Sequence, residues 1–251
     1  MRALLSTMFV DADWAGSGVG AVVAEGKVFG TNAFATIQSA VTAAAAGDEI
    51  DVAAGTYSGA VSIAKPLSIA GAGAADTTLD VSAVASSYGV TISAADVSLS
   101  GLTITGSTSN ARLRYGVYAS GTTGLALSRL VVNSMPSSGV NLIGATDFTI
   151  DGVTSRDNLG AGFFFTDVKR ATLTDVATSG NGWTGVGFST SGRYYPIGVE
   201  GVVIAGASTF GESATDNGGI MFEESSWDGT AYDPSNPHPI TFSTDVADGA
   251  D

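Results

Sequence analysis

The chain has 251 residues with a formal net charge of −14, no cysteine, 34 glycines and only 14% charged residues. Its negative field repels phosphate backbones and anionic membrane surfaces, so nucleic acid is not expected as a partner. The lack of cysteine excludes disulfides and thiolate metal sites. No stretch approaches about 18 consecutive apolar residues, so membrane insertion is not expected.

The first 47 residues predict an N-terminal cap. A weak strand is expected at 21–24 and a helix over about 33–46, with Asn32 as its N-cap and Gly47 as its stop. Apolar residues fall on one face of this helix: Phe34, Ile37 and Val41. An open solenoid end exposes strand edges and core side chains, so we expect the helix to cover that end.

Residues 48–80 predict the first coil. Strands are expected at 48–52, 61–63 and 67–69, with Gly55-Thr56-Tyr57 as a turn and a loop over 71–80.

A repeat of fixed length governs the middle of the chain. Five short apolar runs each begin with a glycine, and the first four glycines are 23 residues apart: Gly116, Gly139, Gly162, Gly185 and, after a longer interval, Gly219. Such a period indicates a solenoid. Three aliphatic stations per period predict an all-β parallel β-helix, with three strands per coil and coils of about 23 residues over 48–222. Because a solenoid adds coils to one core, residues 1–251 are expected to form a single domain.

Four motifs near the N-terminus carry a family resemblance: Phe34–Val41 (FATIQSAV), Gly47–Ile50 (GDEI), Gly55–Tyr57 (GTY) and Ile63–Leu67 (IAKPL). The region 10–80 resembles the cap and first coil of right-handed parallel β-helix proteins of the pectate-lyase-like superfamily. The resemblance implies a right-handed, single-stranded β-helix with a capping helix. Enzymes, surface adhesins and phage spikes share these motifs, so no activity is implied.

Alternation along the first strand of each coil predicts one inward and one outward row. The outward row is Tyr118, Asn141, Phe164, Gly187 and Met221. The aromatic side chains Tyr118 and Phe164 offer a large contact area for sugar rings. Coverage by a loop or a neighbouring subunit is the alternative.

A charge constellation is expected on one turn. Asp147, Arg170 and Arg193 each lie eight residues after their coil glycine, so they should stack about 4.8 Å apart. One interpretation is a surface ion ladder, worth under about 1 kcal/mol per pair. The other is an anion grip that includes Lys169 and binds a sugar carboxylate or sulfate. An inserted loop is expected near 191–196, where Arg193, Tyr194 and Tyr195 lie together.

The C-terminal stretch 223–251 departs from the repeat and is expected to be a second cap or a frayed end. Four acidic residues there offer oxygen ligands for Ca²⁺ but match no calcium loop: Glu223, Glu224, Asp228 and Asp233. The only histidine, His238, lies between two prolines without a partner at a motif spacing. No cofactor, metal site or catalytic residue is therefore assigned. Asn158 and Asn181 are expected to adopt left-handed turns and to stack through hydrogen bonds.

Two classes of function remain open. The first hypothesis is a non-catalytic module of a secreted or cell-surface bacterial protein, a rigid spacer that binds a polysaccharide or cell-surface partner. The motifs of polygalacturonases, pectin methylesterases and alginate epimerases are missing. The second is a polysaccharide lyase or related carbohydrate-active enzyme, in which the turn with Arg170 and Arg193 and the inserted loop form one wall of the groove. Its base would be an arginine or lysine on a turn: Arg156, Lys169, Arg170 or Arg193. A trimeric phage spike segment would need an exposed apolar face along the coils.

Overall fold

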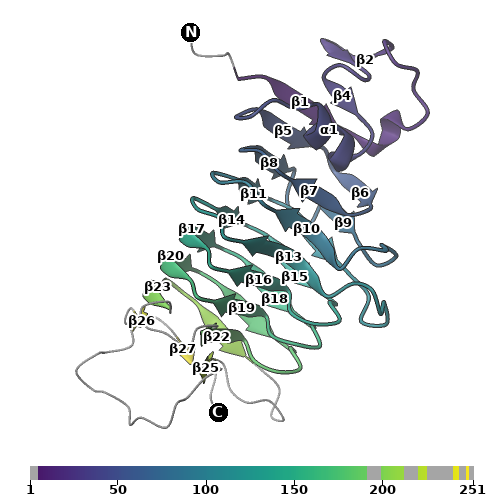
Figure 1. Ribbon diagram of the computed structural model, residues 1–251. Helices are drawn as coiled ribbons and strands as arrows, with labels where there is room; N and C mark the ends of the chain where they lie inside the picture. Colours follow the sequence, from purple (N-terminus) through teal and green to yellow (C-terminus); the bar gives the residue numbers. More distant parts are fainter. Residues whose placement is uncertain (1–4, 191–198, 212–219, 225–239, 243–246, 249–251) are drawn as a thin grey trace.

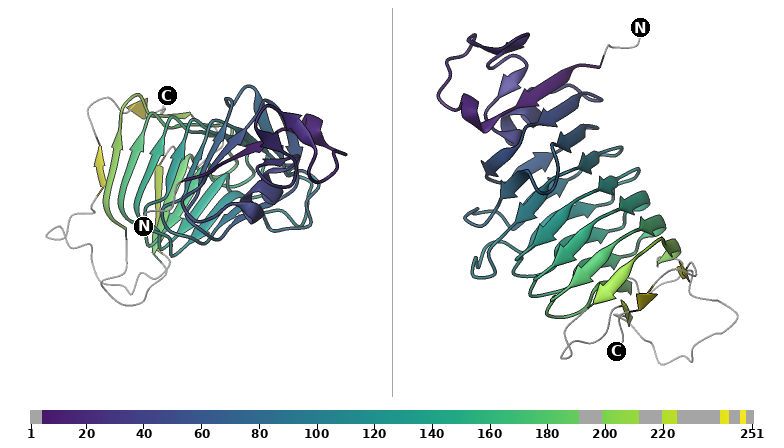
Figure 2. Two further views of the ribbon diagram at one scale, coloured as in Figure 1. Left: turned by 90° about the horizontal axis from the view of Figure 1, so that it is seen from above. Right: turned by 180° about the vertical axis from the view of Figure 1, so that it is seen from behind.

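The computed structural model describes residues 5–190, 199–211, 220–224, 240–242 and 247–248. Their strands form three parallel sheets that run side by side along one axis, so that coil stacks upon coil from one end of the molecule to the other (Figures 1 and 2). No helix among the described residues has the length and apolar character needed to span a bilayer.

Each regular coil contributes one strand to each sheet, which confirms the parallel β-helix with three strands per coil. The ten-stranded sheet comprises β1 (Thr7–Val10), β4 (Ala33–Phe34), β5 (Glu49–Val52), β8 (Ser68–Gly71), β11 (Ser98–Ser100), β14 (Ala126–Ser128), β17 (Thr146–Asp151), β20 (Lys169–Thr174), β23 (Glu200–Ala205) and β26 (Ile240–Phe242). The seven-stranded sheet comprises β7 (Val61–Ile63), β10 (Tyr88–Ile92), β13 (Tyr115–Ser120), β16 (Val140–Ile143), β19 (Phe163–Thr166), β22 (Val186–Thr190) and β25 (Ile220–Glu224). The eight-stranded sheet comprises β6 (Gly55–Ser58), β9 (Thr77–Asp80), β12 (Thr103–Thr105), β15 (Val131–Asn133), β18 (Thr154–Arg156), β21 (Ala177–Ser179), β24 (Thr209–Gly211) and β27 (Ala247–Asp248). The remaining elements are the 3₁₀ turn η1 (Ala12–Trp14), the antiparallel hairpin β2 (Val22–Ala24) and β3 (Lys27–Val28), and the helix α1 (Ile37–Ala43).

The register follows the 23-residue period. Val140 pairs with Val117 on one side and with Phe163 on the other, all in parallel strands. The described residues of the inward row are buried as expected: Val117, Ala119, Val140, Leu142, Phe163, Phe165, Val186 and Phe188. Phenylalanine rings form a column in the interior. The ring centroid of Phe165 lies 5.4 Å from that of Phe188 and 5.6 Å from that of Phe148. This column fills the space between the sheets with close-packed apolar side chains.

The coil glycines are required because successive backbones approach closely. A Cβ on Gly139 would lie 2.9 Å from the carbonyl oxygen of Gly162 and 2.1 Å from Oγ of Ser155. A Cβ on Gly116 would meet the carbonyl oxygen of Gly139 at 2.8 Å in the same way. Glycine is therefore needed at these positions, because the backbone of the next coil leaves no room for a Cβ atom.

Buried asparagines link three coils. The side chain of Asn158 donates to Oδ1 of Asn181 at 2.8 Å, and its own Oδ1 accepts the backbone N–H of Met135 at 3.0 Å. Both asparagines are 1% exposed. The expected hydrogen-bonded stack is confirmed, but the left-handed turn is wrong for both asparagines, since the preceding residues Asp157 and Gly180 carry the positive φ, of 55° and 62°.

Two motif residues of the cap region tie its segments together. The buried carboxylate of Asp48 accepts the backbone N–H groups of Ser6 and Ala45, at 2.9 and 2.7 Å. Nζ of Lys65 donates to the carbonyl oxygens of Thr42 and Ala44, at the C-terminal end of α1. A lysine at this end of a helix satisfies carbonyls that have no partner within the helix.

Tertiary pairing makes the capping helix shorter than the expected 33–46. Phe34 pairs with Val10 in a strand, and the helix begins only after Thr36, whose hydroxyl accepts the N–H of Ser39 at 3.2 Å. Asn32, the expected N-cap, instead accepts the backbone N–H of Val28. The helix ends at Ala43, before Gly47.

Three other expectations change. Gly55-Thr56-Tyr57 lies in strand β6, because Tyr57 is buried and its hydroxyl donates to the carbonyl oxygen of Ala53. Within the expected loop 71–80, Thr77–Asp80 forms β9, which pairs with β6. In the stretch 223–251, β26 and β27 continue two of the sheets, so parallel pairing extends beyond residue 222. The acidic side chains considered for calcium there, and His238, lie outside the described side chains.

We expect Gly139→Ala to lower the free energy of unfolding by about 2–3 kcal/mol, because the added methyl group forces backbone shifts in a packed interior. Gly18→Ala is the control, since a Cβ on Gly18 meets nothing within 4 Å. Denaturant titration followed by circular dichroism measures both. Equal stability of the two variants would contradict the close-approach argument.

Asn158→Ala should lower the free energy of unfolding by about 1–3 kcal/mol, because it leaves the buried N–H of Met135 without its acceptor. It also removes the side-chain hydrogen bond to Asn181, whose Oδ1 then keeps only the backbone N–H of residue 158. Thr149→Ala, at an exposed position of β17, should change the free energy of unfolding by less than about 0.5 kcal/mol. The same titration tests both variants. An unchanged free energy of unfolding in Asn158→Ala would show that the hydrogen bonds of the buried asparagines do not hold the coils together.

Candidate functional site

Three tyrosines stack on the outer side of the seven-stranded sheet. The ring centroid of Tyr118 lies 4.1 Å from that of Tyr88 and 6.0 Å from that of Tyr115, and the planes of all three rings lie within 13° of parallel. The guanidinium of Arg114 lies 5.6 Å from the centroid of Tyr115. We call Tyr88, Tyr115 and Tyr118 the tyrosine cluster. All three are partly exposed, so their rings are available to a ligand.

Sheet register brings the cluster together. Tyr88 and Tyr115 are paired at the start of β10 and β13, and Tyr118 pairs with the smaller Thr91, which leaves room over β10 for its ring. Burial raises the pKa of the Tyr88 phenol, and the neighbouring Tyr118 and Tyr115 raise it further. The Tyr88 hydroxyl is therefore neutral at physiological pH and can donate a hydrogen bond.

A second aromatic pair lies further along the same sheet. The ring centroids of Phe164 and Trp183 are 5.2 Å apart, with an angle of 42° between the planes. A Cβ on Gly187, the next residue in the outward row, would lie 2.6 Å from Cδ2 of Phe164. The phenylalanine ring therefore lies against the backbone of Gly187, where only glycine leaves room for it.

Asn141 lies between the two aromatic groups. It pairs with Tyr118 on one side and Phe164 on the other, and it is only 3% exposed. Its Oδ1 is buried without a hydrogen-bond partner. An unsatisfied buried acceptor is costly and rare in proteins. We call this surface the aromatic face, defined by Tyr88, Tyr115, Tyr118, Asn141, Phe164 and Trp183.

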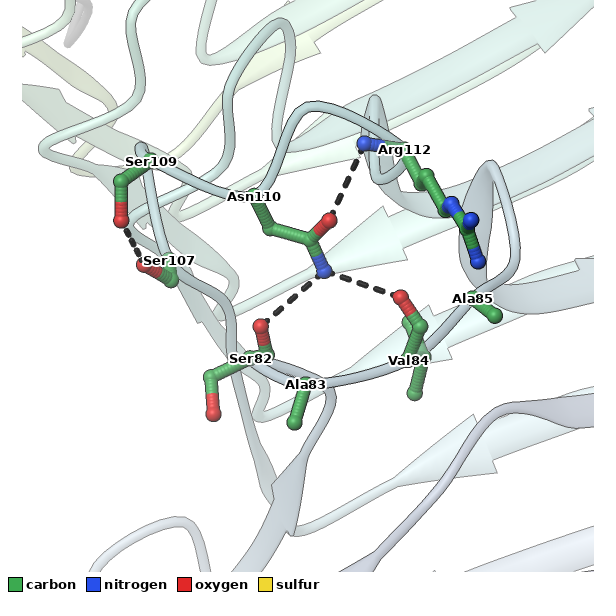
Figure 3. Close-up of a pocket in the computed structure, with 8 residues that line it drawn as sticks. All are labelled: Ser82, Ala83, Val84, Ala85, Ser107, Ser109, Asn110 and Arg112. Atoms are coloured by element: carbon green, nitrogen blue, oxygen red, sulfur yellow. Dashed lines mark hydrogen bonds between the residues drawn. The ribbon is translucent and has the colours of Figure 1, made fainter.

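Two neighbouring loops, 81–87 and 106–114, lead directly into Tyr88 and Tyr115 and border the tyrosine cluster. Asn110 fixes them to each other, because its Nδ2 donates to the carbonyl oxygens of Ser82 and Val84 at 3.0 and 2.9 Å (Figure 3). Between the loops is an open hollow of about 300 Å³ that Arg112 also lines. These loops form a fixed wall beside the aromatic face.

Asp147 and Arg170, which were expected on a turn, lie at the start of β17 and β20 and form a bidentate ion pair. Nε and one terminal nitrogen of Arg170 donate to the two carboxylate oxygens of Asp147, at 2.6 and 2.7 Å. These hydrogen bonds from Arg170 lower the pKa of Asp147. Both side chains are more than half exposed, so the geometry agrees with the interpretation as a surface ion ladder.

In the next coil, the residue beside Arg170 is Gly201 and not the expected Arg193. Ala171 pairs with Val202, 31 residues on, whereas it pairs with Phe148 at the regular 23. Eight extra residues therefore lie between β22 and β23, and the count from Gly185 no longer gives the structural position. The backbone conformation of the column is conserved, with positive φ at Asp147, Arg170 and Gly201.

The structure thus separates the residues proposed from the sequence. Tyr118 and Phe164 belong to the aromatic face, whereas Lys169 and Arg170 begin the next strand, in the ten-stranded sheet. Arg193, Tyr194 and Tyr195 lie outside the described residues. Sequence reasoning missed three members of the face: Tyr88, Tyr115 and Trp183. Tyr115 directly precedes the coil glycine Gly116, and its pairing partner Tyr88 precedes Gly89, the matching glycine of the preceding coil.

The aromatic face contains no charged side chain in the described part of its outward row, which runs Ser62, Thr91, Tyr118, Asn141, Phe164 and Gly187. Nor do the described residues include three or more acidic or histidine side chains grouped as for a metal ion. What the face offers is aromatic area, phenol hydroxyls and one amide, which suit binding of a hydroxyl-rich ligand.

Comparison with known proteins identifies the fold. No family model matches the sequence, and no curated protein matches it. Among solved structures, ORF18 of Geobacillus virus E2 matches with a TM-score of 0.57 and 14% identity, over 81% of this chain and 48% of that one. Pectate lyase Pel9A matches with a TM-score of 0.58 and 12% identity, over 97% and 78%. The catalytic domain of a GH87 α-1,3-glucanase matches with a TM-score of 0.53 and 16% identity, over 74% and 36%.

The chain is therefore a right-handed parallel β-helix protein with the pectate-lyase-like fold. It spans about half the length of the viral protein and about a third of that of the glucanase domain. With identities of 16% or less, the likeness extends to the fold alone.

The Asp147–Arg170 pair should stabilise the fold only above acid pH. The pKa of Asp147 is lower in the folded state than in the unfolded state. The contribution of the ion pair to the free energy of unfolding is therefore fully present above the unfolded-state pKa, and it is lost as the pH falls through the folded-state pKa. We expect Asp147→Asn to lower the melting temperature slightly at neutral pH and to have no effect once Asp147 is protonated. Melting followed by circular dichroism across the acid range tests this, with Asp151→Asn as the control. A difference that persisted at the lowest pH would contradict the assignment.

Proposed function

We propose that this protein is a non-catalytic module of a secreted or cell-surface bacterial protein, and that it binds a polysaccharide along the aromatic face. The observation that carries the proposal is the outward row of the seven-stranded sheet, where a stack of three tyrosines and a Phe164–Trp183 pair flank Asn141. Fold neighbours whose names include pectate lyase and α-1,3-glucanase support a carbohydrate as the ligand class.

The geometry favours a linear polymer. The outward row runs along the helix axis, and Tyr118 and Phe164 are two strands apart, or about 10 Å. A chain lying along the axis would contact both aromatic groups with successive sugars. Between them, a sugar hydroxyl would satisfy Oδ1 of Asn141 once the neighbouring rings shift to admit it. The stacked coils hold these groups at fixed spacing, as the proposed rigid spacer requires.

A polysaccharide lyase is the second candidate, favoured by the pectate lyase among the fold neighbours. Lyase chemistry needs a basic group at the sugar carbon that loses its proton. The described outward row has no lysine, arginine, histidine or carboxylate, and the guanidinium of Arg170 is engaged by Asp147. These observations support binding over catalysis.

We expect Tyr118→Ala and Phe164→Ala each to weaken polysaccharide binding about fivefold, because stacking on an aromatic ring contributes about 1 kcal/mol. Thr149→Ala, on the outer side of the ten-stranded sheet, is the control and should bind normally. Affinity electrophoresis and calorimetry against a panel of uronate polymers and neutral glucans measure the effect.

The same panel, followed by ultraviolet absorbance, detects the unsaturated sugars that a lyase releases. Binding without such products is the expected result. Release of unsaturated products would refute the non-catalytic assignment, and binding unchanged in both aromatic variants would refute the site.

A further inference from the structure

A second hollow, of about 350 Å³, lies at the N-terminal end on a different sheet from the aromatic face. Its floor is the outer side of the ten-stranded sheet, at β1, β5 and β8, and its walls are η1 and the hairpin β2–β3, which projects beyond the first coil (Figure 1). We call it the N-terminal hollow, lined chiefly by Phe9, Asp11, Trp14, Lys27, Asp51 and Ala70. Its size is at the lower end of the range for small-molecule sites.

The aromatic rings of this hollow already hold a cation. Nζ of Lys27 lies 4.1 Å from the ring centroid of Phe9 and 5.6 Å from that of Trp14. An ammonium group at these distances is attracted by the negative faces of the rings. The two rings are therefore placed to receive a positive charge, and the protein fills that position with its own lysine.

The charges around the hollow are unbalanced. Two carboxylates, Asp11 and Asp51, line it with the single ammonium of Lys27. Within the described residues, neither carboxylate forms an ion pair. One oxygen of Asp11 accepts the backbone N–H of Asp13, whereas Asp51 is exposed and pairs in register with Phe9 and Ala70. One negative charge beside the rings is thus left without a partner.

The floor beside Asp51 leaves space for a ligand. Ala53, Ala70, Gly71 and Ala72 line this part of the hollow, and none of them projects a long side chain. A small body carrying one ammonium group would fit over this floor, with its charge between Asp51 and the rings. Its positive charge would also be favoured by the net charge of −14.

We propose that the N-terminal hollow binds a small ligand that bears an ammonium group, of the size of an amino sugar, in competition with the ammonium of Lys27. The ligand cation contacts the rings of Phe9 and Trp14 and pairs with Asp51. This site does not depend on the function proposed for the aromatic face, because it lies on another sheet and binds another chemical group.

The test compares glucosamine with N-acetylglucosamine at mildly acidic pH, where only glucosamine is charged. Calorimetry on the whole protein should detect glucosamine binding, and N-acetylglucosamine should bind at least about fivefold more weakly. Equal binding of the two sugars, or no binding of glucosamine, would overturn the proposal.

Two variants locate the site. Asp51→Asn should weaken glucosamine binding about fivefold or more, whereas Asp151→Asn, another exposed aspartate on the same sheet, should leave it unchanged. Lys27→Met removes the competing ammonium but keeps an apolar stem, and it should strengthen binding several-fold. Unchanged affinity in Asp51→Asn, or weaker binding by Lys27→Met with its circular dichroism spectrum preserved, would count against the site.

Discussion

The close approach of one coil's backbone to the next is the constraint on which this structure depends. At Gly116, Gly139 and Gly162, a single added carbon would collide with the backbone of the following coil. This spacing lets parallel strands pair in register over three sheets, and residues one repeat apart then become neighbours. Four features arise because residues of successive coils lie side by side: the phenylalanine column, the hydrogen-bonded asparagines, the tyrosine cluster and the Asp147–Arg170 pair.

The outer surfaces of the sheets differ in the kinds of side chain that they carry. The seven-stranded sheet carries aromatic rings and an unsatisfied amide oxygen, while the ten-stranded sheet carries the paired charges of Asp147 and Arg170 at the start of β17 and β20. Large rings and a described outward row without charged side chains are suited to contact with sugar rings. The N-terminal hollow differs from both, since there aromatic rings and carboxylates surround one lysine.

The repeat carries most of the fold information because each coil obeys the same local rules. Gly116 to Gly185 are evenly spaced, so both the register and the inward and outward rows could be predicted from the sequence, including the placement of Tyr118 and Phe164. Prediction failed where a distant partner decides the conformation. Phe34 has helical spacing but pairs with Val10, and Thr77–Asp80 looks irregular but pairs with β6.

The candidate site was predicted only in part, for a related reason. Tyr88 and Tyr115 precede the coil glycine and fall outside the alternation that identified Tyr118, so only the ring geometry shows that the three belong together. Counting from a glycine also failed for Arg193, because an insertion separates it from its expected column. A period predicts neighbours reliably within uninterrupted coils and loses this power across an insertion.

The direction of the inter-coil hydrogen bonds has a mechanical consequence. These bonds lie roughly along the long axis, so a pull between the first and last coils loads them in tension, and one coil can peel from its neighbour before the next is strained. The buried Asn158–Asn181 contact reinforces one such boundary with side-chain bonds. Under load, the molecule would therefore lengthen in steps, one coil at a time, with the asparagine-linked coils among the last to yield.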